Sequence, residues 1–248
     1  MAPSTSISTA PSTQLPPQLR IVPLTSQNLQ AFRRLTSTLL PMSYPDAFYS
    51  ALLDPEPSER NAFSIARVAL WDDCSSTIVT PQVESHAQVV GGIAGRIQAL
   101  DSNEKSESAR QECQLYLATL AVLAPWRGMG IATALMDGIL RAAMDAACTE
   151  TVMSDHGKAR IHDGFKDDIV AAPGLGRLTS IYAHVWETNE MGLEWYLARG
   201  FRVGDVVKGY YRKLRPDGAR IVRRGVVGIM VGDGGRTRKN DSRDTNGE

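Results

Sequence analysis

Arg127-Gly128-Met129-Gly130-Ile131-Ala132 is the strongest local feature of this sequence. It lies between a β-rich run, Gln114–Val122, and an apolar helical pattern that continues to about Cys148. Small residues at such a turn let the backbone approach a ligand, and the unpartnered first-turn N–H groups of the helix attract an anion. A diphosphate fits this chemistry, although a plain glycine-containing turn explains the pattern as well. The stretch matches neither a Walker A loop nor the dinucleotide fingerprint.

Strand and helix patterns alternate on both sides of this turn. They predict an α/β (α+β) fold with a mixed central sheet flanked by helices. Strands are expected at residues 21–24, 63–71, 87–97, 114–122, 178–185, 201–207 and 209–214. Four helices are expected: one at 26–39, a short one that begins near 45, a long one that follows the 127–132 turn and ends at about 148, and one at 188–199.

The predicted boundaries follow from the regions that lack these patterns. We expect a disordered tail at 1–19, a domain at 20–215 with insertions at about 101–111 and 151–175, and a C-terminal tail at 216–248 that is mostly flexible and locally basic. Residues 221–230 are apolar enough to pack. The basic residues of the tail favour a solvated segment over contact with ribosomal RNA or an acidic partner.

The composition restricts the class of protein. The 248 residues carry a formal net charge of zero and 43% are hydrophobic, so the chain can bury a core and has no overall charge to attract nucleic acid or a membrane. No apolar run approaches the roughly 20 residues of a membrane helix, and the Ser/Thr/Pro-rich start lacks a signal-peptide core. Cys74, Cys113 and Cys148 have no metal-ligand spacing. We expect free thiols in a reducing compartment, no metal, no membrane and no direct DNA binding.

Two motifs together resemble the GNAT acetyltransferase superfamily. Arg127–Ala132 resembles its Arg/Gln-x-x-Gly-x-Gly/Ala signature, and Asn189–Phe201 resembles the second hallmark, where Asn opens a helix that holds an aromatic–Tyr pair and ends at Gly-Phe. A closer resemblance, over roughly residues 19–216, is to the family of NatE catalytic subunits. It is carried by Pro41–Tyr49, Leu115–Leu120, Ile181–Val185 and Tyr210–Lys213.

The resemblance implies a GNAT fold whose sheet is splayed at an acetyl-coenzyme A site. It also implies acetyl transfer from acetyl-CoA to the α-amine of nascent proteins, with Met followed by a hydrophobic residue as the preferred N-terminus. Leu40 and Met42 stand where the family has Phe and Val, and Met191 and Gly192 replace small helix formers. These departures bear on the peptide preference more than on the fold.

Site residues are implied in the same way. His184, with Tyr116, would act as a base through an ordered water, since an α-ammonium has a pKa of about 7.7–8.0 and His titrates near neutral pH. Tyr196 would give the leaving thiolate a proton or a hydrogen bond, and backbone N–H groups from Leu120 to Val122 would bind the oxyanion. The remaining cofactor contacts would be Arg127, Gly128, Met129, Gly130, Ile131, Ala132, Thr133 and Asn189. The peptide would contact Leu40, Pro41, Met42, Tyr44, Tyr210 and Tyr211.

Each assignment has a structural alternative. His184 fits a core histidine, Tyr116 and Tyr196 fit core aromatics, and the two adjacent tyrosines fit a hairpin edge. Asn189 fits a helix cap. The function has alternatives too: a GNAT enzyme that acetylates lysine or small amines, or a catalytically weak subunit that docks on the NatA complex. The family implies NatA auxiliary and catalytic subunits as partners, ribosome association and a cytoplasmic location, with a nuclear pool left open.

Overall fold

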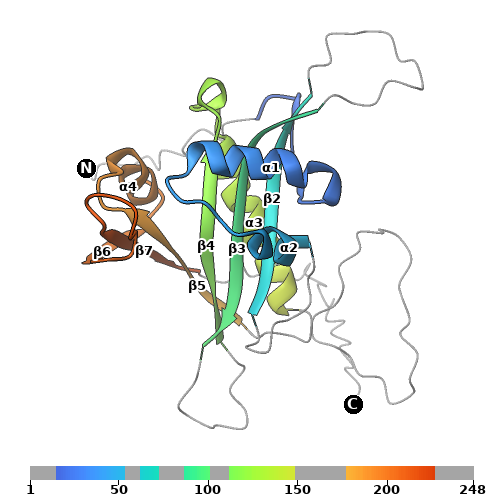
Figure 1. The fold of residues 1–248 in the computed structure, drawn as a ribbon. Helices are drawn as coiled ribbons and strands as arrows, with labels where there is room; N and C mark the ends of the chain where they lie inside the picture. The colour runs from blue at the N-terminus through green and yellow to red at the C-terminus, as the bar shows by residue number, and fades with distance from the viewer. Residues whose placement is uncertain (1–14, 54–61, 73–86, 101–111, 149–176, 227–248) are drawn as a thin grey trace, which may run out of the picture.

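A seven-stranded sheet with helices on both faces forms the centre of the protein (Figure 1). The computed structural model describes residues 15–53, 62–72, 87–100, 112–148 and 177–226. The strands are β1 Leu19–Pro23, β2 Ala62–Trp71, β3 Gln88–Ala99, β4 Glu112–Val122, β5 Arg177–Trp186, β6 Arg202–Val207 and β7 Ala219–Gly225. They are ordered β1-β2-β3-β4-β5-β7-β6, and every neighbouring pair is antiparallel except β4 and β5. The mixed α/β fold class is confirmed.

Within the described residues, four helices cover the sheet. They are α1 Ser26–Leu39, α2 Asp46–Leu53, α3 Ile131–Cys148 and α4 Glu190–Leu197, and a 3-10 turn, η1 Ala124–Trp126, precedes α3. The helices α1 and α2 lie on one face of the sheet, α3 lies on the other, and α4 lies beside β6 and β7 (Figure 1). The bounds predicted for α1 and for the end of α3 are confirmed.

Apolar residues at helical spacing explain how the two faces are covered. In α1, Phe32 and Leu35 are buried in a cluster with residues of β2 and β3. In α3, the fully buried Leu135, Ile139 and Ala143 recur every fourth residue and pack on the opposite face. Because residues four apart lie on one side of a helix, each helix presents one continuous apolar stripe to the sheet.

The predicted C-terminal boundary at residue 215 is wrong. Strand β7 lies between β5 and β6, so the domain extends to at least Gly225, and no strand forms at 209–214. In β7, Ala219 and Val222 are buried while Arg220, Arg223 and Arg224 are not, so the arginines hid the strand signal. These three are strand residues rather than part of a solvated tail.

The predicted N-terminal boundary also needs correction. Leu19 is buried in β1, and Leu15 packs against the core, so the ordered chain begins before residue 20. The rest of the predicted tails (1–14 and 227–248), the predicted insertions (101–111 and 151–175) and Cys74 lie outside the described residues. In the part of the chain that is described, no helix is long and apolar enough to cross a membrane, and no group of three His, Cys, Asp or Glu could hold a metal ion.

Candidate active site

A β-bulge in the middle of β4 shapes the site. On the β3 side, Thr119 pairs with Ala94, and Leu117 pairs with Gly95. Ala118 is therefore an extra residue in β4 with no partner of its own on β3. A bulge of this kind bends its strand and increases the local twist. It also exchanges the faces to which the following side chains point.

The two central strands separate at the same level. The parallel ladder between β4 and β5 ends at Leu117 and Ala183, although β4 continues to Val122 and β5 to Trp186. Beyond this level the backbone groups of the two strands are not joined to one another. This is the splay of the sheet that the family resemblance implied.

Backbone N–H groups of β4 point into the gap between the separated strands. The Leu123 N–H donates to the Val90 carbonyl at 2.9 Å, across β3. Because N–H and C=O directions alternate along a strand, the amides of Leu120 and Val122 point away from β3 and toward the gap. The Val122 carbonyl agrees with this direction, since it accepts a 3.0 Å hydrogen bond from Arg127 Nε rather than from β3.

The turn before α3 has the backbone that an anion-binding loop requires. Gly128 and Gly130 have φ angles of 82° and 80°, which residues with a Cβ adopt only with strain. A Cβ at Gly128 would have no atom within 4 Å, so the surface at this point is open. Helix α3 begins at Ile131, and the amides of its first turn have no partners inside the helix. The turn therefore presents N–H groups and the positive end of a helix dipole.

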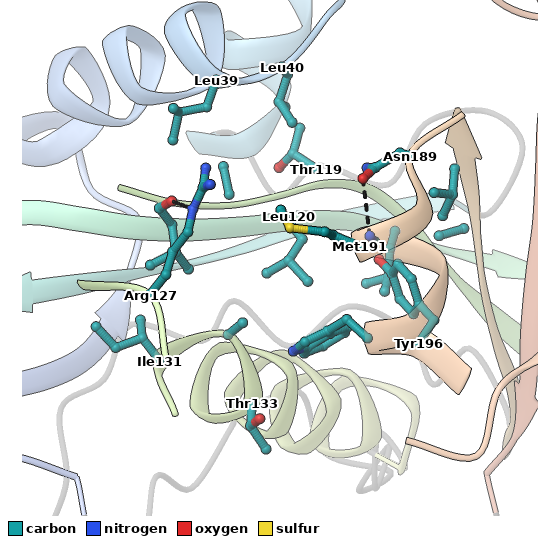
Figure 2. A pocket seen from close by; sticks show the side chains of 18 of the residues that line it. Leu39, Leu40, Thr119, Leu120, Arg127, Ile131, Thr133, Asn189, Met191 and Tyr196 are labelled. Atoms are coloured by element: carbon teal, nitrogen blue, oxygen red, sulfur yellow. Dashed lines mark hydrogen bonds between the residues drawn. The ribbon is translucent and has the colours of Figure 1, made fainter. Parts of the chain in front are cut away.

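These features surround one cavity of about 1370 Å³ (Figure 2). Its walls come from the end of α1, the separated parts of β4 and β5, the turn before α3, and α4. Of the predicted site residues, the cavity is lined by Leu40, Pro41, Met42, Tyr44, Leu120, Val122, Arg127, Gly128, Gly130, Ile131, Ala132, Thr133, His184, Asn189, Tyr196 and Tyr211.

Helix α4 supplies one wall. Asn189 caps this helix, because its Oδ1 accepts a 3.0 Å hydrogen bond from the Gly192 N–H (Figure 2). Tyr196 is buried, with its ring centroid 5.0 Å from that of Trp195 and 4.9 Å from that of Phe201. Both structural alternatives, a cap and a core aromatic, therefore hold, and both residues also line the cavity.

An aromatic cluster holds the histidine. The His184 ring stacks on Tyr210 with centroids 4.1 Å apart and planes 12° apart, and Tyr116 meets it edge-on at 5.6 Å. The Tyr116 and Tyr210 hydroxyl oxygens are 3.0 Å apart and share a hydrogen bond. The Tyr211 hydroxyl donates to the His184 carbonyl at 3.0 Å. The rings of β4, β5 and the β6–β7 loop thus fix the orientation of the imidazole.

Burial adjusts the protonation of this cluster. It lowers the pKa of His184, so the imidazole is neutral near pH 7. Its Nδ1 is buried without a hydrogen-bond partner among the described residues. Burial, and then the hydrogen bond to Tyr210, raise the pKa of Tyr116. Burial, and then Tyr211, raise the pKa of Tyr196. Near pH 7 the imidazole is therefore neutral and both phenols keep their protons.

The segment between α1 and α2 closes the cavity on the side of the sheet that carries these helices. The Tyr44 hydroxyl donates to the carbonyl of Ala118, the bulge residue, at 2.7 Å. The Tyr44 ring stacks on Phe48 at 4.3 Å. Leu40 and Thr119, both labelled in Figure 2, line the cavity. The Thr119 hydroxyl on this wall is buried without a partner among the described residues.

The loop between β6 and β7 is fixed by its own hydrogen bonds. Asp217 accepts from the Tyr211 N–H at its carbonyl (2.8 Å) and from the Gly209 N–H at Oδ1 (3.2 Å). Glu187 Oε1 accepts from the Gly218 N–H at 2.9 Å. These contacts position the two adjacent tyrosines against the end of β5, so they belong to an ordered loop and not to a strand.

Three predicted residues are not on the wall of the main cavity. Met129 packs against the core, Tyr210 contacts His184, and Tyr116 lines a smaller cavity of about 200 Å³. Tyr44 and Ala118 line both cavities, which therefore adjoin.

Sequence reasoning missed other residues on the main wall, chiefly Thr119, Trp195 and Arg199. Thr119 reads as a strand core residue until the bulge is known. Trp195 and Arg199 lie four residues apart in the motif that contains Tyr196, and this spacing is the signal that could have placed them on one side.

Comparison with known proteins agrees with this geometry. The Acetyltransferase (GNAT) family model matches residues 43–162. N-alpha-acetyltransferase 50 of Danio rerio is 23% identical over 218 residues, 88% of this chain and 95% of the relative. Probable N-acetyltransferase san of Drosophila melanogaster is 25% identical over 201 residues, 81% of this chain and 77% of the relative.

Solved structures share the fold. Arabidopsis thaliana Naa50 in complex with the bisubstrate analogue CoA-Ac-MVNAL superposes with a TM-score of 0.53 at 22% identity, over 84% of this chain and 98% of that one. Arabidopsis thaliana NAA60 in complex with acetyl-CoA gives a TM-score of 0.56 at 15% identity, with the same coverage of 84% and 98%.

Proposed function

The chain is an acetyltransferase with a GNAT domain, and on this premise we propose that it transfers an acetyl group from acetyl-CoA to the α-amine of a protein N-terminus. The observation that carries the proposal is the bulge at Ala118 together with the end of the β4–β5 ladder at Leu117 and Ala183. This opening brings inward-pointing amides, a phosphate-type loop and a neutral histidine to one cavity.

The residues present fit acetyl-CoA. The turn from Arg127 to Gly130 and the first turn of α3 suit the diphosphate, because their backbone leaves open space and unpartnered amides. The gap between β4 and β5 suits the pantetheine arm, whose amides can bond the free edge of β4. Acetyl-CoA supplies the activated thioester, and the protein supplies position and proton transfer.

His184 would act as the general base. An amine attacks a thioester only when neutral, and an N-terminal α-ammonium has a pKa of about 7.7–8.0, so a modest base is sufficient. The burial that keeps His184 neutral suits this task. Tyr116 lies edge-on to the imidazole and would share an ordered water with it, so that the amine proton passes through the water to His184.

The negative charge that develops on the acetyl oxygen would be met by the amides of Leu120 and Val122. Such preorganised donors act in a water-poor site and are worth about 3–4 kcal/mol each in well-studied enzymes. Tyr196 is buried and keeps its proton because its pKa is raised. It would give the leaving thiolate a hydrogen bond or a proton as the new amide bond forms and the thioester bond breaks.

The acceptor would enter from the side of α1 and α2. Leu40, Pro41, Met42 and Tyr44 would surround the first side chain in an apolar pocket, and Tyr210 and Tyr211 would hold the peptide backbone. A pocket of this type favours an initiator Met followed by a hydrophobic residue, although one methylene changes binding by only about 1–3 kcal/mol. The name and bisubstrate ligand of the Naa50 structure support this class of acceptor.

Partners form a further part of the proposal. Docking on the NatA auxiliary and catalytic subunits, ribosome association and a cytoplasmic location all rest on the resemblance to NatE catalytic subunits. Co-purification of tagged chain with NatA subunits from cell extract tests the docking. Its absence at physiological salt would contradict it.

The activity is tested with acetyl-CoA and three peptides: one beginning Met-Leu, one beginning Ser-Glu, and one with a blocked N-terminus and an internal lysine. We expect release of CoA with the Met-Leu peptide and little with the other two. A preference for the blocked lysine peptide would establish the lysine acetyltransferase alternative instead.

Two variants separate catalysis from binding. His184→Ala should bind CoA in calorimetry like the wild type and lose most acetylation. Arg141→Leu removes an exposed charge of α3 that does not line the cavity, and it should behave like the wild type. CoA binding without acetylation of any peptide by the wild type would favour a docking subunit over an active enzyme.

A further inference from the structure

Arg199, two residues beyond the end of α4, is fixed against the start of α3. Its Nε and Nη2 both donate to Thr133 Oγ1, at 3.2 and 2.7 Å, and its Nη1 donates to the Trp195 carbonyl at 3.0 Å. The guanidinium carbon lies 4.0 Å from the centroid of the Trp195 ring. The side chain is half-buried. Three hydrogen bonds to two acceptors, together with the Trp195 ring, thus hold this cation in one place.

The position is electrostatically unfavourable for a purely structural cation. Thr133 lies in the first turn of α3, where the helix dipole already presents positive charge. The ion pairs among the described residues are Arg20–Asp72 and Arg33–Asp46, so Arg199 has no carboxylate at salt-bridge distance there. Burial lowers the pKa of Arg199. The negative charge of Asp137, one turn further along α3, raises the pKa of Arg199. Two positive groups therefore face one another with little compensation.

The same cation borders the cavity of the acetyl donor. Thr133, Asp137, Trp195 and Arg199 line the cavity that also contains the turn from Arg127 to Gly130. A guanidinium has five N–H donors, and three of them are used inside the protein. The two that remain suit a phosphate, which arginine binds strongly and with fixed geometry.

We propose that Arg199 binds a phosphate of the nucleotide half of the acetyl donor and so makes the enzyme select donors that carry this nucleotide. The inference rests on the proposed function, and in particular on acetyl-CoA as donor. Coenzyme A offers two sources of phosphate, the diphosphate bridge and the 3′-phosphate of its ribose. Both share the chemistry that Arg199 recognises.

The test compares three donors: acetyl-CoA, acetyl-dephospho-CoA, which lacks the 3′-phosphate, and S-acetylpantetheine, which lacks the nucleotide. Wild type, Arg199→Leu, Arg199→Lys and the exposed control Arg141→Leu are assayed for kcat/KM with the Met-Leu peptide. We expect Arg199→Leu to lose about tenfold with acetyl-CoA, the size of a charge-assisted hydrogen bond. It should lose nothing with S-acetylpantetheine, and Arg199→Lys should retain part of the activity.

The dephospho donor identifies the phosphate. If Arg199→Leu removes the wild-type preference for acetyl-CoA over acetyl-dephospho-CoA, Arg199 binds the 3′-phosphate. If the preference persists while both nucleotide donors weaken, it binds the diphosphate. An equal loss with S-acetylpantetheine would overturn the inference, because Arg199 would then act only by positioning α4. An unchanged kcat/KM with acetyl-CoA would overturn it as well.

Calorimetry separates this inference from the proposed function. CoA and pantetheine are titrated into each variant without any acceptor, after thermal melts have shown that the variants fold. If the wild type binds CoA but acetylates no peptide, the proposed acceptor is wrong while the loss of CoA affinity in Arg199→Leu still supports the inference. If the wild type binds no CoA, both fail.

Discussion

His184 and Tyr210 stack face to face, with ring centroids 4.1 Å apart and an interplanar angle of 12°. The two residues come from β5 and from the β6–β7 loop, and the Tyr210 hydroxyl reaches the Tyr116 hydroxyl at 3.0 Å. The Tyr210 ring covers one face of the imidazole and restricts its rotation. The geometry of the proposed base thus depends on a loop rather than on its own strand.

Tyr210 therefore has two separable contributions. Tyr210→Phe keeps the stack and removes the hydroxyl bond, whereas Tyr210→Leu removes both. Since an aromatic pair contributes about 0.5–1.5 kcal/mol beyond its buried area, we expect Leu to lower kcat about tenfold more than Phe does. CoA affinity measured by calorimetry should be the same in both. Equal kcat values for the two variants would show that the stack has no role in catalysis.

His184 should titrate below the ordinary histidine pKa of 6.5, because burial disfavours its charged form. An NMR titration of the ring protons measures this directly. The native state then binds fewer protons than the unfolded state as the pH falls below about 6.5, so the free energy of unfolding decreases on acidification and is regained as the pH rises. His184→Phe should lose this part of the pH dependence in urea unfolding. A pKa above 6.5 would contradict the assignment of a neutral base.

Tyr44→Phe should weaken the peptide site and spare the donor site. It removes the 2.7 Å hydrogen bond to the Ala118 carbonyl, which ties the segment after α1 to the bulge. We expect a cost of about 1 kcal/mol in stability and a several-fold higher KM for the Met-Leu peptide. Tyr49→Phe is the matched control, since its hydroxyl pairs with Thr36 at 2.8 Å away from the cavity. It should lower stability and leave the peptide KM unchanged.

Gly192 and Asn189 should be energetically coupled. A Cβ at Gly192 would lie 2.6 Å from Asn189 Nδ2, so Gly192→Ala displaces the cap. Either single change to Ala should cost about 1 kcal/mol in the free energy of unfolding. In the double variant Gly192→Ala should become stabilising by roughly 0.5–1 kcal/mol, because only its helix propensity remains. Strict additivity in urea unfolding would contradict the clash.

Truncation tests the position of β7. A chain that ends at residue 215 lacks the strand between β5 and β6 and should not fold cooperatively, whereas a chain that ends at 226 should melt as the full chain does. Circular dichroism with thermal melting and CoA calorimetry measure both. Folding and CoA binding by the shorter chain would contradict the sheet order.

Local features could be predicted from the sequence. The periodicity of Phe32 and Leu35 and the polar residues before them determine α1, and Gly128 and Gly130 indicate the turn before α3. The Asn189 side chain accepts a hydrogen bond from the N–H of Gly192, only three residues later in the sequence. Its role as a helix cap can therefore be predicted from the local sequence. Each of these depends on residues within one or two helical turns, where propensity and hydrogen bonding act alone.

Pairings between distant segments were decided only by the tertiary structure. The bulge at Ala118 exists because β4 pairs with β3, and no property of Ala118 itself indicates it. Strand β7 was not predicted because its arginines obscure the apolar pattern of a strand. The strand is stabilised by the burial of Ala219 and Val222 against its neighbours, which the sequence does not show. Tyr116 and Tyr210 meet across 94 residues of chain, and Arg199 meets Thr133 across 66. Contacts between distant residues form only after the entropy cost of closing the intervening loops has been offset by pairing in the sheet. The local sequence therefore determines the helices and strands, while the packed sheet determines the site.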